Sequence, residues 1–118
     1  MQHDFDKYFD TTSEYWQLLQ ELYEENKHYA KKIVKGRNLH HIFPRSFSKL
    51  EKKPVDNDKE NLISLSILDH FRAHYYLYRC TKTGYKRHTS LPFHYMLKKA
   101  LSRISKEKLF EIVEILLI

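Results

Sequence analysis

Apolar residues in the first third of the chain recur at the spacing of one face of a helix. Between residues 11 and 35 they fall three, four or seven positions apart, at Tyr15, Leu18, Leu19, Leu22, Tyr29 and Ile33. Thr11 and Glu14 have the spacing of a capping box, and Gly36 suits the end of a helix. The pattern predicts one long amphipathic helix over residues 11–35.

The periodicity then changes from helical to extended. RNLHHIF (residues 37–43) predicts a short strand that Pro44 ends, and NLISLS (61–66) predicts a second strand. The polar and charged segment between them is expected to be a surface loop. Ser66 and Asp69 form a second capping pattern, which predicts a helix over residues 67–80 before TKTG breaks it at Gly84.

The remaining pattern predicts two C-terminal helices. Residues 91–102 follow Ser90 as a cap with Pro92 in the first turn, and residues 106–117 follow Ser105. The last helix is strongly apolar, so we expect it to dock against the first helix or a partner chain. The fold class is therefore a mostly helical α+β domain. Residues 1–36 would supply an N-terminal helix, 37–80 two short antiparallel strands and a helix, and 81–118 the C-terminal helices.

Charge is distributed unevenly along the chain. The net charge is +6, but residues 31–109 have nineteen Lys and Arg against six acids, whereas residues 1–30 have two lysines against seven acids. A basic middle segment is typical of a protein that binds a polyanion, and nucleic acid is the leading partner. A lysine-rich face that only keeps the protein solvated is an equally good explanation of charge alone.

Composition argues against a secreted or membrane protein. No run approaches the roughly eighteen apolar residues of a membrane span, and MQHDFDKYFD lacks the basic flank and apolar block of a secretory signal. The single Cys80 cannot form a disulfide framework. We therefore expect an intracellular, cytoplasmic protein that does not contact a membrane.

Four histidines and one asparagine form the candidate chemistry: His40, His41, Asn61, His70 and His74. His70 and His74 are four residues apart on the predicted helix, so both lie on one face and can hold one metal ion. The helix N-terminus near His70 favours the neutral imidazole that a metal needs. Taken singly, each histidine is more simply a core residue, and Asn61 a residue that opens a strand.

In this order, LHHIFPRS, NLISLS and HFRAHYYL resemble the HNH nuclease family, whose ββα-metal unit has a histidine at the end of its first strand, an asparagine at the second and a metal ligand on its helix. His70 follows Asn61 by nine positions and His74 follows by four more, the spacing of histidine-rich members. HHIFPRS and HFRAHYYL are also similar to small stand-alone HNH proteins of phages. The resemblance covers residues 37–80.

The resemblance implies a metal-dependent DNA endonuclease with specific roles for these residues. His40, His70 and His74 would be metal ligands, His41 the general base, Asn61 the residue that orients His41, and Arg45 a phosphate contact. Double-stranded DNA would be the substrate, with a homodimer or a phage partner protein as further partners. The chain departs from the family in lacking a glycine pair in the loop and the CxxC knuckles of many members.

The chemistry explains these residue types. Histidine has an ordinary pKa near neutrality, so it can take a proton from water, and a metal ion can stabilise charge on the phosphate. An all-histidine ligand set favours one divalent zinc, nickel, cobalt or manganese ion over magnesium, although substrate oxygens make magnesium worth testing. The expected phosphate contacts are Arg45, Lys49, Arg72, Arg79, Lys82, Lys86 and Arg87.

Two other functions remain open from the sequence. His40, His70 and His74 can hold a structural zinc in a nucleic-acid-binding module without catalysis, but such a site has no use for His41. A degenerate HNH fold that serves only as an interaction protein is the other alternative. Catalysis also sets a geometric condition, because adjacent residues of a regular strand point to opposite faces. His40 and His41 can reach one site only if the strand ends or bends there.

Overall fold

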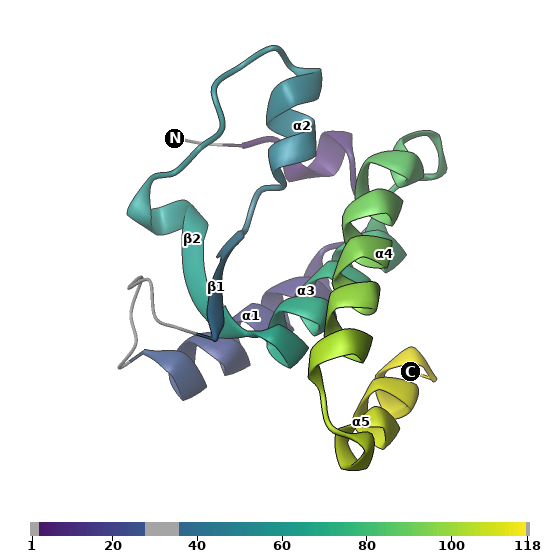
Figure 1. Cartoon of the computed structure of the whole chain (residues 1–118). Coiled ribbons are helices and arrows are strands. Elements are labelled where there is room, and N and C mark those ends of the chain that lie inside the picture. The colour runs from purple at the N-terminus through teal and green to yellow at the C-terminus, as the bar shows by residue number, and fades with distance from the viewer. Residues whose placement is uncertain (1–2, 28–35, 118) are drawn as a thin grey trace.

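The structure is a computed structural model that describes residues 3–27 and 36–117. These residues form a mostly helical α+β fold (Figure 1). In chain order the elements are α1 (Ser13–Asn26), β1 (Arg37–His41), α2 (Arg45–Leu50), β2 (Leu62–Ser66), α3 (Ile67–Cys80), α4 (Lys86–Arg103) and α5 (Lys106–Leu116), with 3₁₀ turns at Phe5–Lys7, Lys59–Asn61 and Thr83–Tyr85. No described helix is long and apolar enough to span a membrane.

The two strands form an antiparallel pair that places the histidines at a strand end. His40 pairs with Ile63 and His41 with Leu62. His40 and Ile63 are both buried, so this face of the sheet packs on the core. β1 ends at His41, and the chain bends through Ile42 and Phe43, which we expected to continue the strand. The histidine pair therefore lies where the strand stops.

The central element is α3, which contacts α1, both strands, α4 and α5. Its start confirms the predicted cap, because the Ser66 hydroxyl accepts a hydrogen bond from the backbone amide of Asp69 at 3.2 Å. Its end at Cys80 is also as expected. Because β2 leads into α3 without an intervening residue, the first turns of the helix lie against the strands (Figure 1).

Two hydrophobic clusters hold the fold together. The first joins α1, α2, the sheet and α3 and includes Tyr8, Phe9, Tyr15, Leu18, Leu22, Phe43, Phe47, Leu65 and Leu77. The second joins α3, α4 and α5 and consists of Phe71, Phe93, Met96, Ala100, Ile112 and Ile115. The last helix thus packs in the second cluster rather than against the first helix.

The N-terminal segment differs from the single long helix that we expected. Before α1 lie the 3₁₀ turn and an isolated bridge that pairs Phe9 with Thr81. Thr12 is the N-cap of α1 and makes no side-chain cap hydrogen bond, so the predicted capping box does not form. Tyr15, Leu18, Leu19 and Leu22 are buried as expected. The expected end of this helix falls in residues 28–35, which lie outside the described residues.

Two helices differ from the prediction: α2 was not expected, and α4 is longer than expected. The segment predicted as a plain loop contains α2, whose Phe47 is fully buried and stacks on Tyr8 with ring centroids 4.2 Å apart. α4 begins at Lys86 rather than at residue 91, so Pro92 lies inside the helix. Thr89, in the additional first turn, is buried, and its hydroxyl lies 2.8 Å from that of Thr81.

Candidate metal and active site

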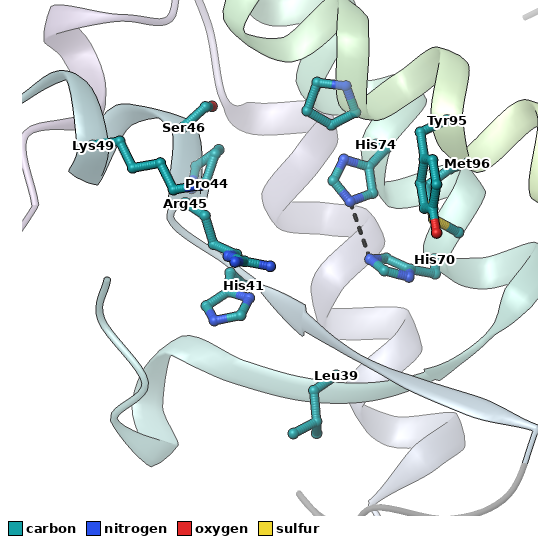
Figure 2. A pocket seen from close by; sticks show the side chains of 11 residues that line it. Leu39, His41, Pro44, Arg45, Ser46, Lys49, His70, His74, Tyr95 and Met96 are labelled. Atoms are coloured by element: carbon teal, nitrogen blue, oxygen red, sulfur yellow. Dashed lines mark hydrogen bonds between the residues drawn. The ribbon is translucent and has the colours of Figure 1, made fainter. Parts of the chain in front are cut away.

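Three histidines from β1 and α3 meet in the interior. His40 comes from β1, and His70 and His74 lie one turn apart on α3. A nitrogen of each of the three rings lies within 4.8 Å of the others. Nε2 of His70 is 3.0 Å from Nε2 of His74 (Figure 2), and the His40 ring centroid is 5.1 Å from both of theirs. The structure therefore brings together the three residues expected as metal ligands.

The surroundings of these imidazoles keep them neutral. Burial, followed by repulsion from the neighbouring histidines, lowers the pKa of His40 well below its usual 6.5. Burial is also the main cause that lowers the pKa of His70 to about 2 and that of His74 to about 4. A neutral imidazole has the free lone pair that a metal ion requires.

Hydrogen bonds fix the rings of His40 and His70. Nε2 of His40 lies 2.8 Å from the hydroxyl of Tyr15, on α1. Nδ1 of His70 lies 3.2 Å from Oδ1 of Asn38, and Lys99 on α4 donates to the same oxygen at 3.3 Å. Metal-binding histidines are commonly oriented through the ring nitrogen that does not bind the metal. Both rings have such a contact.

The donor set fits a divalent metal ion. Zinc–nitrogen bonds of about 2.0–2.1 Å in a tetrahedral site place two nitrogens about 3.3 Å apart, close to the separation of the α3 histidines. The buried Nδ1 of His40 has no hydrogen-bond partner among the described residues. Such an unpaired buried atom is unfavourable, and a cation would satisfy it. Three protein ligands would leave a coordination position open.

His41 lies on the wall of a pocket that it shares with the histidines of α3. The pocket has a volume of about 380 Å³ and is lined by Leu39, His41, Pro44, Arg45, Ser46, Lys49, His70, His74, Pro92, Tyr95 and Met96 (Figure 2). His40 is completely buried, whereas His41 is only half-buried. β1 ends at His41, and the His41 side chain lines the same pocket as His70 and His74, whereas His40 lies behind it in the core.

The residue that holds His41 is Asn57, from the loop before β2. Its Oδ1 lies 2.7 Å from Nε2 of His41. An amide oxygen only accepts hydrogen bonds, so this nitrogen of His41 carries a proton and Nδ1 keeps its lone pair.

Asn61 does not make the direct contact with His41 that we expected. It is buried, and its Oδ1 accepts a hydrogen bond from the Phe43 amide at 2.7 Å. Its Nδ2 donates to the carbonyl oxygens of Asp56 at 2.9 Å and of Phe43 at 3.4 Å. The side chain is thus occupied by backbone on both sides of the long loop. Asn61 therefore holds the bend after β1 and also holds Asp56, the residue before Asn57. Any influence of Asn61 on His41 is indirect, through these backbone contacts.

Two of the expected phosphate contacts lie at the pocket. Arg45 and Lys49 come from α2, line the pocket and are exposed. The other five do not line it: Arg72, Arg79, Lys82, Lys86 and Arg87. Two of these have acidic neighbours, since Arg72 lies 3.2 Å from an oxygen of Asp69 and Arg79 lies 3.7 Å from one of Glu14.

Polar residues around the site that sequence reasoning missed include Tyr15, Asn38, Asn57, Tyr95 and Lys99. Asn38 had a local signal, because residues two apart in a strand share a face and it precedes His40 by two. The others come from elements far away in the sequence or from an irregular loop, and no local pattern marks them.

Comparison of the chain with protein-family models, with curated proteins and with solved structures finds no match.

Proposed function

We propose that this protein is a metal-dependent DNA endonuclease of the HNH type. The observation that supports this most is that one pocket is lined by three features. They are His70 and His74 of α3, His41 held by Asn57, and the positively charged side chains of Arg45 and Lys49. A structural metal site explains the first feature only. Hydrolysis of a phosphodiester needs all three, because water must be deprotonated and the phosphate must be bound and neutralised.

His41 is the general base of the proposed reaction. Its hydrogen bond to Asn57 leaves Nδ1 as the basic atom. From there it takes the proton of a water molecule positioned for attack on phosphorus. Because Nε2 is held, the ring keeps this tautomer between turnovers.

His40, His70 and His74 would hold the metal ion. The ion, when bound, supplies Lewis-acid stabilisation of charge on the phosphate and the leaving oxygen. Zinc, nickel, cobalt and manganese suit the nitrogen donors, and magnesium is tested beside them. The buried His40 anchors this set to the core.

Arg45 and Lys49 bind the phosphate backbone. Both are exposed residues of the short helix α2, which borders the pocket beside His41. Phosphate contacts of this kind position a nucleic acid without reading its sequence. We therefore propose double-stranded DNA bound with low sequence specificity. One such pocket in a monomer would nick one strand at a time.

Cleavage of a supercoiled plasmid tests the proposal. The protein is stripped with chelator and reloaded with zinc, nickel, cobalt, manganese or magnesium in turn. At least one metal should restore open-circle product, and His41→Ala should lose about a hundred- to ten-thousand-fold of the rate. His94→Ala is the matched control, because His94 is exposed and does not line the pocket.

Two results would reject the nuclease. Equal cleavage by wild type and His41→Ala would show that another base or a contaminant acts. Loss of folding on chelation with no cleavage under any metal would instead support the structural-zinc module, the alternative that the buried position of His40 favours.

A further inference from the structure

We propose that Tyr15 is a positioning residue that sets the tautomer of His40 and thereby makes Nδ1 the metal-binding atom of that histidine. The inference rests on the proposed metal site but not on cleavage of DNA. It concerns α1, an element outside β1 and α3, which supply the four histidines.

The hydroxyl of Tyr15 lies between two possible partners. It is 2.8 Å from Nε2 of His40 and 2.9 Å from the carbonyl oxygen of Ile42. Tyr15 is 1% exposed and His40 is 0% exposed, so water does not substitute for either contact.

Counting protons determines the direction of both bonds. The carbonyl oxygen of Ile42 can only accept, so the single proton of the Tyr15 hydroxyl is donated to it. The hydroxyl oxygen is then an acceptor toward His40, whose Nε2 must carry a proton. The reverse arrangement would leave two acceptor oxygens facing each other 2.9 Å apart in the core.

The consequence falls on the other ring nitrogen. A neutral His40 that is protonated at Nε2 has its lone pair on Nδ1, the buried atom without a hydrogen-bond partner. His70 has the opposite arrangement, because Nδ1 must donate to Oδ1 of Asn38, and its Nε2, 3.0 Å from Nε2 of His74, keeps its lone pair. Tyr15 and Asn38 therefore make the strand and helix ligands offer different nitrogens to one ion.

The first experiment reads the tautomer directly. Nitrogen-15 NMR of the histidine side chains, in chelated and in zinc-loaded protein, distinguishes a protonated from an unprotonated or metal-bound nitrogen. His40 should be protonated at Nε2 in both samples, with zinc on Nδ1 in the second. A proton on Nδ1, or zinc on Nε2, would overturn the proposal without recourse to any variant.

The second experiment compares two buried tyrosines. Tyr15→Phe keeps the ring and removes the hydroxyl, and we expect His40 to become a mixture of tautomers and zinc affinity to fall about 10- to 100-fold. Tyr8→Phe is the control, because Tyr8 is also 1% exposed and its hydroxyl donates to Glu51 at 2.7 Å. Its zinc affinity should stay within about twofold of wild type.

Titration calorimetry, with cobalt(II) absorption as a second readout of ligand geometry, measures both affinities. Equal losses in the two variants would mean that any buried hydroxyl has this effect, which would reject a positioning role. Zinc bound through Nδ1 of His40 in a protein that cuts no DNA would reject the nuclease and keep this inference. If wild-type protein binds no zinc, this inference fails, whereas the nuclease is decided by cleavage with the other metal ions.

Discussion

The Asn61→Ala substitution tests whether Asn61 stabilises the fold or acts directly on the proposed general base, His41. The wild-type side chain closes the long loop by bonding the backbone of Phe43 on one side and that of Asp56 on the other. Alanine leaves the buried Phe43 amide and the Asp56 carbonyl without these partners. The substitution should therefore destabilise the protein, and the loss of cleavage should follow from the displaced bend.

The size of the effect follows from the three bonds. Those at 2.7 and 2.9 Å have good hydrogen-bond lengths, whereas the one at 3.4 Å is long and contributes little. A buried group that loses its partner costs about 1–3 kcal/mol. Since water can reach part of the opened loop, we expect a total loss of about 2–4 kcal/mol. With a urea m-value of about 2 kcal/mol/M, the unfolding midpoint should fall by about 1–2 M.

Urea unfolding of wild type, Asn61→Ala and Asn57→Ala, in excess zinc and in chelator, measures this. Asn57 is exposed and holds only the ring of His41, so its variant should unfold within about 0.5 kcal/mol of wild type yet cleave about five- to tenfold more slowly. An Asn61→Ala midpoint within about 0.3 M of wild type, combined with cleavage as low as that of His41→Ala, would refute the reasoning. It would mean that Asn61 acts on the base itself.

Two further predictions concern the metal and the phosphate contacts. Zinc at a hundred times its dissociation constant should raise the free energy of unfolding by about 2.7 kcal/mol, and most of this gain should disappear in His70→Ala. Thermal unfolding with and without chelator measures the gain. An unchanged melting temperature would contradict a metal site. In fluorescence-anisotropy titrations, the affinity for DNA should fall less steeply with salt in Lys49→Ala than in wild type, with the slope of log affinity against log salt smaller in magnitude by about 0.9. Arg87→Ala, at a residue outside the pocket lining, should leave this slope unchanged.

The parts of the fold that the sequence predicted correctly are those with local causes. α3 has a cap at Ser66 and follows its strand directly, so its bounds and the shared face of His70 and His74 follow from short-range pattern. α2 depends instead on Phe47 packing against Tyr8, 39 positions earlier in the chain. A six-residue helix with one buried anchor looks like a polar loop until its partner is known.

The same distinction applies to the candidate site. The residues that supply the chemistry could be selected by type and spacing, but the residues that orient them could not. Tyr15 reaches His40 only because α1 packs on the buried face of the sheet. Asn57 reaches His41 from irregular backbone, for which periodicity gives no direction. Three-dimensional packing decides these contacts.

The end of β1 explains how neighbouring histidines lie in different surroundings. In a continued strand, His41 would point away from the face on which His40 is buried. The strand stops at His41, and Asn61 holds the Phe43 backbone in the bend that follows. His40 is therefore fixed in the core, while His41 stands on the wall of an open pocket. Asn61 holds the bend that follows both histidines, which is a structural reason for an asparagine here that does not require contact with His41.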